Sequence, residues 1–266
     1  MKQQLIIDAH AHIFPEKIAQ KAVASIGQFY DIPMGHQGLS QSLLDSGSRI
    51  GVSRYLVCST ATTPAQVTSI NDFIAGECRR HPAFFGFGTL HPQLAGLEAE
   101  VERIAALGLH GVKLHPDFQR FDIDDPAALV LYRLCGRAGL PILFHTGDDR
   151  YDYSAPRRMA AVARQFPELT CIAAHFGGYR RWQDVPVYRD IPNLCFDTSS
   201  SLFALSRQEA VELIGLLGED RFFFGTDFPM WDHRQELDRF LALGLPEDTQ
   251  EKILAGNFLR VLGDGR

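Results

Sequence analysis

The segment Asp8-Ala9-His10-Ala11-His12 ends the first apolar run of the chain. Residues two apart on a strand project to the same face, so His10 and His12 are expected to point in one direction. Two imidazoles on one face can bind a single divalent ion without a change in the backbone. Packed or solvated histidines can share this spacing, so the motif needs support from elsewhere in the chain.

Three more polar residues stand at the ends of later apolar runs. His145 and His175 each end such a run, and Asp227 directly follows Phe222–Thr226. Burying these groups is costly unless they are paired or bound to a metal. A few nitrogen and oxygen ligands with one open position suit a catalytic zinc or a similar divalent ion. The alternative is a hydrogen-bonded polar cluster without metal.

Lys113 and His115 lie two apart in the run Gly111–His115, and both are expected on one face. A buried lysine can act as a base, become a carbamate that bridges two metals, or bind a substrate carboxylate as a cation. It can also extend from the rim into solvent. His115 is expected to line the pocket.

Short apolar runs alternate with stretches of helical periodicity. Strands that alternate with helices predict βαβ units and a parallel sheet, and right-handed crossovers repeated in this way close into a barrel. An open doubly wound sheet is the alternative, although no G-x-G-x-x-G sequence follows the first run. The expected strands are Leu5–His10, Tyr55–Ser59, Phe84–Leu90, Gly111–His115, Ile142–His145, Thr170–His175, Leu194–Thr198 and Phe222–Thr226. The expected helices include Leu97–Leu107, Pro126–Ala138, Ala155–Gln165 and Gln208–Leu217.

The expected fold class is therefore α/β, a single-domain (β/α)8 TIM barrel over residues 1–266. Its first connection is elaborated at about residues 13–38, with a helix over Pro15–Ile26 and a loop across the mouth of the barrel. Such a loop is expected to act as a lid or a specificity element. Because the carboxyl ends of barrel strands meet at one rim, the polar residues above are expected to meet there too.

Composition excludes several classes of protein. Lys and Arg number 26 and Asp and Glu 32, so the net charge is −6 and the basic footprint of a nucleic-acid-binding protein is missing. No stretch approaches the ~18 uninterrupted apolar residues of a membrane span. The opening Met1–Gln4 does not resemble a signal peptide. The five cysteines form no C-x-x-C pair, which favours reduced thiols and a cytoplasmic protein.

Five segments of the chain resemble the amidohydrolase superfamily in sequence and order. The nearer likeness is to its amidohydrolase-related branch, which includes metal-dependent hydrolases and the aminocarboxymuconate-semialdehyde decarboxylase type. The closing segment Ile253–Phe258 is similar to the final helix of that branch. The five segments are Ile7-Asp8-Ala9-His10-Ala11-His12, Gly111-Val112-Lys113-Leu114-His115-Pro116, Phe144-His145-Thr146-Gly147, Ala174-His175-Phe176-Gly177-Gly178 and Gly225-Thr226-Asp227-Phe228-Pro229.

The resemblance implies a distorted barrel with one divalent metal, expected to be zinc, held by His10, His12, His145 and Asp227. His175 and Asp227 would be the catalytic residues. His175 would act as an acid, a base or an electrostatic partner, and Asp227 would move a proton from an activated water to the leaving group. In the two-metal alternative, a carboxylated Lys113 and His175 become additional ligands.

Loops after the strands supply candidates for substrate binding. Arg150 and Tyr153 follow the fifth expected strand and Trp231 follows the eighth, and Lys113 and His115 complete this set. An arginine among aromatic residues suits an aromatic or unsaturated carboxylate. Of the remaining histidines, His36 and His233 are expected in loops near the mouth, whereas His81 and His110 precede strands and are expected at the opposite end.

The expected activity is that of a metal-dependent hydrolase acting on an amide, lactone or similar carbonyl compound, with a small carboxylate as substrate. The alternative is a metal-dependent non-oxidative decarboxylase or hydratase of an aromatic or unsaturated carboxylic acid. The two activities share the same ligands, so the sequence does not separate them. The expected partner is a small-molecule substrate, with no nucleic acid and no membrane. A homodimer is compatible with the fold but is not required by any sequence feature.

Overall fold

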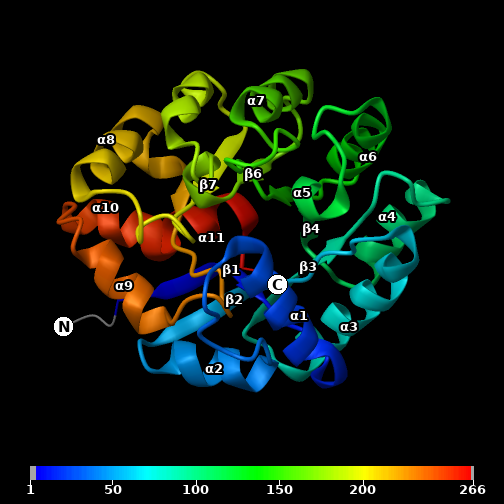
Figure 1. Cartoon of the computed structure of the whole chain (residues 1–266), viewed down its shortest axis with the longest axis horizontal. Helices are drawn as coiled ribbons and strands as arrows, with labels where there is room; N and C mark the ends of the chain where they lie inside the picture. The colour runs from blue at the N-terminus through cyan, green and yellow to red at the C-terminus, as the bar shows by residue number, and fades with distance from the viewer. Residues whose placement is uncertain (1–3, 265–266) are drawn as a thin grey trace.

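Eight parallel strands form a nearly closed barrel with the helices arranged around it (Figure 1). The computed structural model describes residues 4–264, so the segment Met1–Gln3 at the start of the chain lies outside the described residues. The strands pair in sequence order, β1 (Ile6–His12), β2 (Val52–Cys58), β3 (Phe84–Thr89), β4 (Gly111–Leu114), β5 (Ile142–Phe144), β6 (Cys171–Ala173), β7 (Leu194–Asp197) and β8 (Phe222–Phe223). This order confirms the predicted TIM barrel and excludes the open doubly wound sheet.

The first strand and the segment after the last strand close the ring. The Ala9 amide donates to the Phe224 carbonyl at 2.8 Å, and the Asp227 amide donates to the His10 carbonyl at 2.8 Å. A further parallel bridge joins Ala11 to Phe228. These bonds place the histidines of β1 directly beside the polar residues that follow β8.

Helices cover the outside of the barrel, and four of the five helices expected from the sequence are confirmed to within one residue at each end. The α-helices are α1 (Glu16–Tyr30), α2 (Ser40–Ser48), α3 (Val67–Arg80), α4 (Leu97–Ala106), α5 (Pro116–Gln119), α6 (Pro126–Arg137), α7 (Pro156–Gln165), α8 (Arg207–Leu217), α9 (His233–Leu241), α10 (Glu247–Glu251) and α11 (Asn257–Leu262). Short turns of 3-10 helix lie at η1 (Pro64–Gln66), η2 (His175–Gly177), η3 (Trp182–Tyr188) and η4 (Glu219–Arg221), and η5 (Lys252–Gly256) is a π-helical turn. No helix among residues 4–264 has the length and apolar character needed to cross a membrane.

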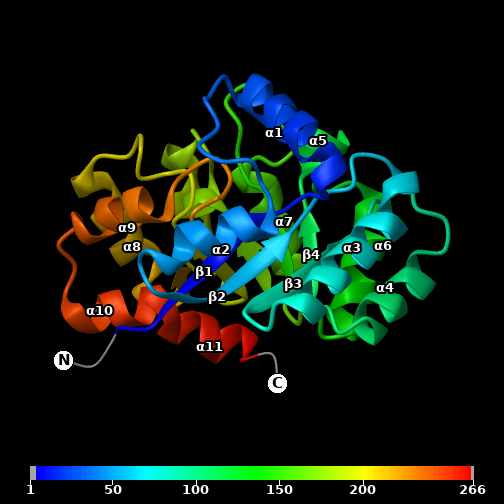
Figure 2. The ribbon, with the colours of Figure 1, turned by 90° about the horizontal axis from the view of Figure 1, so that it is seen from below.

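Helix α1 is longer than predicted and lies over one end of the barrel, opposite α11 (Figure 2). The helix was expected to end at Ile26, but it continues to Tyr30. It stops where Asp31 adopts a left-handed conformation with φ 53° and its amide bonds to the Gly27 carbonyl. The extra turn brings Tyr30 to the mouth of the barrel, where the sequence analysis expected only a loop.

Two apolar layers hold the barrel together. The inner layer is filled from most strands and is closed at the α11 end by Phe258, whose ring lies 5.2 Å from that of Phe85. The outer layer packs the other faces of the strands against the helices. All five cysteines are free, and four of them are buried, as expected for reduced structural thiols.

A substitution at Gly111 on β4 tests how tightly the inner layer is packed. A Cβ at this position would meet the Phe87 ring at 2.5 to 2.7 Å, so Gly111→Ala should lower the free energy of unfolding by about 1–3 kcal/mol. A Cβ at Gly215 in α8 meets nothing within 4 Å, so the control Gly215→Ala should raise it by about 0.5–1 kcal/mol. Urea denaturation measures both. Equal stability of the two variants would contradict this account of the packing.

Candidate active site

Polar residues from β1 and from the segment after β8 meet at the rim of the barrel. The Nε2 atoms of His10 and His12 lie 3.2 Å apart, which confirms that the two rings point in one direction. Oδ1 of Asp227 lies 3.7 Å from His10 Nε2 and 3.3 Å from His12 Nε2. Three donor atoms of the types that bind divalent metals therefore face one point.

Asp227 is held in an unfavourable backbone conformation. Its φ is 58°, in the left-handed region that non-glycine residues avoid at a cost of order 1–3 kcal/mol. The hydroxyl of Ser200 donates to Asp227 Oδ2 at 2.6 Å, and the indole of Trp231 donates to that hydroxyl at 2.9 Å. These bonds leave Oδ1 directed at the two histidines.

A carboxylate that the sequence analysis did not single out sets the orientation of His10. Asp197 at the end of β7 is fully buried, and its Oδ2 lies 2.9 Å from His10 Nδ1. Since a carboxylate only accepts, Nδ1 carries the proton and Nε2 keeps its lone pair. Nζ of Lys113 lies 3.2 Å from that Nε2. Burial lowers the pKa of His10, which keeps the ring neutral near pH 7.

The rings of His145 and His175 face each other, each with an unprotonated nitrogen. His175 Nδ1 lies 3.1 Å from the Ser199 carbonyl, and His145 Nε2 lies 2.9 Å from the Gly147 carbonyl. A carbonyl only accepts, so each of these nitrogens is protonated and the other nitrogen of each ring is not. Those two unprotonated atoms, His145 Nδ1 and His175 Nε2, are 3.0 Å apart. Two lone pairs at this distance repel each other unless a proton or a metal cation lies between them.

Burial acts on both of these rings. It lowers the pKa of His175 to about 4, and it lowers the pKa of His145 well below the usual value. Both imidazoles are therefore neutral near pH 7. His12 differs, because the neighbouring Cys58 thiol and Asp227 carboxylate outweigh the effect of burial and raise its pKa to about 9. Positive charge is thus stabilised on the His12 side of the cluster.

Beneath the site, Asp8 joins the first strand of the barrel to the segment that follows the last strand. Its Oδ1 accepts hydrogen bonds from the His10 and Thr226 amides, each at 3.0 Å. Its Oδ2 lies 3.0 Å from Nε2 of His233. His233 was expected in a loop near the mouth, but it is fully buried at the start of α9. The expected loop position is wrong, because Asp232 caps α9 and turns the next residue inward.

His115 lines the site as expected and connects it to α1. Its ring stacks on that of His145 with centroids 3.9 Å apart, and its Nε2 lies 2.8 Å from the Tyr30 hydroxyl. Asp117, two residues further on, is buried next to these histidines. Its Oδ2 accepts from Ser154 at 2.6 Å, whereas its Oδ1 is buried without a hydrogen-bond partner.

Aromatic side chains from the end of α1 and from three loops form a wall above the histidines, which we call the aromatic wall. Its members, in order around the mouth, are Tyr30, Tyr179, Phe203 and Trp231, with ring centroids 5.3, 6.5 and 5.0 Å apart along the series. Trp231, a predicted substrate-binding residue, is part of this wall, and its role stays a prediction, whereas Phe203 was not singled out in the sequence. Planar groups of a substrate would find a complementary surface along this wall.

Two other predicted substrate-binding residues lie further from the histidines. Arg150 reaches the mouth, but its guanidinium pairs with Asp148, with Nε and one terminal nitrogen at 2.9 and 2.7 Å from the carboxylate. Tyr153 stacks on Tyr151, and within residues 4–264 it makes no ring contact or hydrogen bond with the rim histidines. Both assignments remain predictions.

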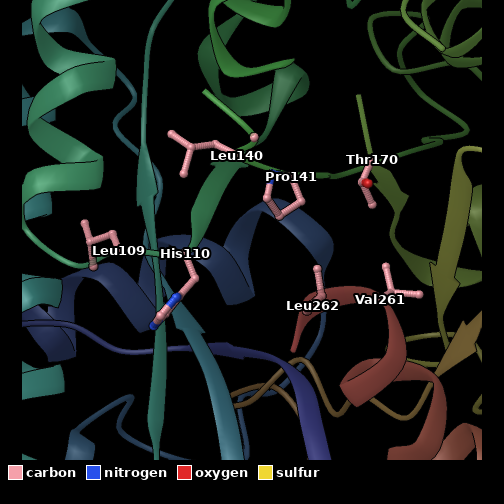
Figure 3. A pocket seen from close by; sticks show the side chains of 8 residues that line it. Leu109, His110, Leu140, Pro141, Thr170, Val261 and Leu262 are labelled. Carbon is pink, nitrogen blue, oxygen red and sulfur yellow. The ribbon is translucent and has the colours of Figure 1, made fainter. Parts of the chain in front are cut away.

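A separate pocket of about 310 Å³ lies at the opposite end of the barrel (Figure 3). His110 and Pro141, which precede β4 and β5, line it together with Val261 and Leu262 of α11. His110 stacks on Phe85 with centroids 4.1 Å apart, as expected for a structural histidine at that end. None of the predicted site residues lines this pocket.

Comparison with known proteins identifies the family. The model of the Amidohydrolase family matches residues 7–263, nearly the whole chain. The chain belongs to this family. A 2-amino-3-carboxymuconate-6-semialdehyde decarboxylase of Dictyostelium discoideum is 25% identical over 246 residues, which cover 73% of this chain and 65% of that relative. The chain thus spans a little less than two thirds of the relative it matches.

Solved structures share the fold. A 5-carboxyvanillate decarboxylase from Sphingomonas paucimobilis is 16% identical with a TM-score of 0.77, over 97% of this chain and 99% of that one. A dihydroxybenzoic acid decarboxylase from Polaromonas sp., solved with bound manganese and 2-nitroresorcinol, is 17% identical with a TM-score of 0.75, over 99% and 98%. The family membership confirms the resemblance found in the sequence.

Asp117 gives the site a pH-dependent stability. Burial raises the pKa of its carboxyl to about 7, whereas an aspartate in an unfolded chain titrates near ~4. The contribution of Asp117 to the free energy of unfolding is therefore largest below about pH 4, and it is lost as the pH rises through about 7. In metal-free protein, Asp117→Asn should gain roughly 1–3 kcal/mol relative to wild type between about pH 5 and pH 8. Urea denaturation across this range measures the difference.

The control for this prediction is Asp122→Asn, which removes a carboxylate whose side chain is 45% exposed and pairs with Arg158. Its stability difference from wild type should not follow the same pH curve. A flat difference for Asp117→Asn as well would show that the buried carboxyl does not titrate near pH 7.

Proposed function

We propose that the chain is a metal-dependent enzyme that removes carbon dioxide, without oxidation, from an aromatic or unsaturated carboxylic acid. The facing donor atoms of His10, His12 and Asp227 are the observation that carries the proposal. The decarboxylases among its relatives support this activity over the hydrolysis of an amide or lactone, which the sequence analysis placed first.

The residues at the rim fit one divalent ion. We assign as ligands His10 Nε2, His12 Nε2 and Asp227 Oδ1, which lie within 3.7 Å of one another. We add His145 Nδ1 as the fourth, because the bond from His145 Nε2 to the Gly147 carbonyl leaves its lone pair available. Three imidazoles and one carboxylate suit zinc and also accommodate manganese, the metal bound in the dihydroxybenzoic acid decarboxylase. When bound, the ion supplies Lewis-acid stabilisation of negative charge on substrate oxygen.

Lys113 has two roles open to it in this arrangement. Once His10 Nε2 binds the ion, the Lys113 amine loses its acceptor and is free to face a substrate carboxylate. In the two-metal alternative, it would carry a carbamate and His175 would also become a ligand. Burial lowers the pKa of Lys113, which favours the neutral amine that carbamate formation requires.

The reaction needs a proton at the carbon that loses its carboxylate. The carbon–carboxylate bond breaks, its electron pair stays on that carbon, carbon dioxide leaves, and a proton takes its place. We assign the transfer of this proton to His175 Nε2, since the Ser199 carbonyl holds Nδ1. His175 is neutral at rest, so Nε2 first takes the proton from a water molecule and then passes it to the carbon. Asp227 orients the reacting group and exchanges protons with it. Rings of the aromatic wall would hold a planar acid against these residues.

Metal binding is tested by elemental analysis of the purified protein. We expect about one divalent ion per chain in the wild type, and loss of the ion in the double variant His10→Ala and His12→Ala. The matched control is His81→Ala, because His81 pairs with Glu77 away from the rim. A metal content near zero in the wild type would contradict the proposal, and a content near two would favour Lys113 and His175 as ligands.

The reaction class is tested by following carbon dioxide and proton release separately. Metal-loaded protein should release carbon dioxide from at least one planar unsaturated acid, such as 5-carboxyvanillate, a dihydroxybenzoate or 2-amino-3-carboxymuconate 6-semialdehyde. Asp227→Asn should reduce turnover at least about 100-fold, since it weakens both ligation and proton exchange. Proton release from lactones or amides without carbon dioxide from any acid would establish the hydrolase instead.

A further inference from the structure

Five arginines stand on the loops after β5 and β6 and at the start of α7, and four of them are already neutralised. The pairs are Arg150 with Asp148, Arg157 with Asp152, Arg158 with Asp124, and Arg181 with Asp184. The fifth, Arg180, is exposed and has no carboxylate within ion-pair distance among residues 4–264. An unpaired cation beside the mouth of the barrel is therefore available to an incoming anion.

The aromatic wall holds the Arg180 side chain in place. Its guanidinium lies over the rings of Tyr179 and Phe203, 5.5 and 5.6 Å from their centroids. Its Nε donates to the Tyr179 hydroxyl at 3.3 Å. These contacts engage the face of the guanidinium and one of its donors, and they leave the two terminal nitrogens for a bidentate partner.

One aromatic ring separates Arg180 from the proposed reaction centre. The Tyr179 ring lies 5.8 Å from the ring of His175 and 6.1 Å from that of His145. On the other side, Phe203 stacks on Trp231, whose indole bonds to the Ser200 that holds Asp227. A planar molecule lying along this wall would thus have one end at the metal ligands and the other end near Arg180.

The backbone of Arg180 adopts an unfavourable conformation. Its φ is 55°, in the left-handed region that non-glycine residues rarely adopt. Arg150, which the sequence analysis expected to bind the substrate, is bound on both edges, to Asp148 and to the Phe29 carbonyl. Of these two arginines, only Arg180 has both terminal nitrogens without a partner among residues 4–264.

We propose that Arg180 binds a second carboxylate of the substrate, remote from the carboxylate that is lost. The substrate class is then a planar unsaturated or aromatic dicarboxylic acid rather than a monocarboxylic acid. This inference rests on the proposed decarboxylase function, because it places the reacting carboxylate at the ligands of the metal. The charge-assisted bidentate pair would supply the preference for two carboxylates.

Binding of simple aromatic acids tests the inference. The probes are benzoate, benzene-1,3-dicarboxylate and benzene-1,4-dicarboxylate, titrated calorimetrically into metal-loaded full-length protein. We expect the wild type to bind at least one of the dicarboxylates about tenfold or more tightly than benzoate. In Arg180→Met this preference should vanish while the Kd for benzoate stays within about twofold, and Arg180→Lys should retain part of it.

The matched control is Arg157→Met, which removes an arginine from the same side of the barrel whose side chain is 63% exposed and paired with Asp152. It should keep the wild-type preference. The inference is overturned if the wild type binds neither dicarboxylate more tightly than benzoate, if Arg180→Met keeps the preference, or if Arg157→Met loses it equally.

The outcomes separate this inference from the proposed function. An Arg180-dependent preference for dicarboxylates, without carbon dioxide release from any acid, would leave the carboxylate site in place and reject decarboxylation. Carbon dioxide release without that preference would support the decarboxylase and reject the role of Arg180.

Discussion

The hydrogen bonds that orient the buried histidines determine the chemistry of the rim. Asp197 holds Nδ1 of His10, and backbone carbonyls hold one nitrogen each of His145 and His175. Each bond fixes one tautomer and turns the remaining lone pair towards its neighbours. Without these acceptors, the rings could rotate or protonate, and the donor atoms would not converge. Burial strengthens the effect, because it keeps His10, His145 and His175 neutral.

The barrel supplies the geometry on which these bonds depend. The closure between β1 and the segment after β8 brings His10 and Asp227 together across the seam, and Asp8 fastens the same seam from below. The left-handed conformation of Asp227 is maintained by this network. Aromatic side chains from the end of α1 and from three loops then line the mouth, so the polar centre faces an apolar surface. This combination fits an enzyme that binds a planar carboxylic acid with its carboxylate next to the proposed metal ligands.

The sequence predicted the barrel and most of the rim because both follow from local patterns. Period-two spacing placed His10 and His12 on one face, and polar residues after apolar runs placed His145, His175 and Asp227 at the same rim. These signals are contained within a few residues. Asp197 was missed because it lay inside an expected strand, although a charged residue within an apolar run is costly unless paired. That cost was a usable signal for it.

Other features depended on contacts between distant segments. Tyr30 reaches His115 only because α1 continues one turn beyond the predicted end, which the left-handed Asp31 determines. The inward turn of His233 depends on Asp8, far away in the sequence. The pairing of Arg150 with Asp148 is local, since the two are two residues apart, and it could have been read from the sequence. The contact of Arg180 with Phe203 depends on the fold.

The central claim is that the unprotonated nitrogen of His145 belongs to a metal site shared with His10, His12 and Asp227. The most direct measurement is anomalous X-ray diffraction at the absorption edge of zinc or manganese on crystals of metal-loaded protein. The account predicts one anomalous peak bounded by His10 Nε2, His12 Nε2, His145 Nδ1 and Asp227 Oδ1, at about 2.0–2.2 Å from each ligand for zinc. No peak at the rim, or a peak bounded instead by His115 and Asp117, would contradict it.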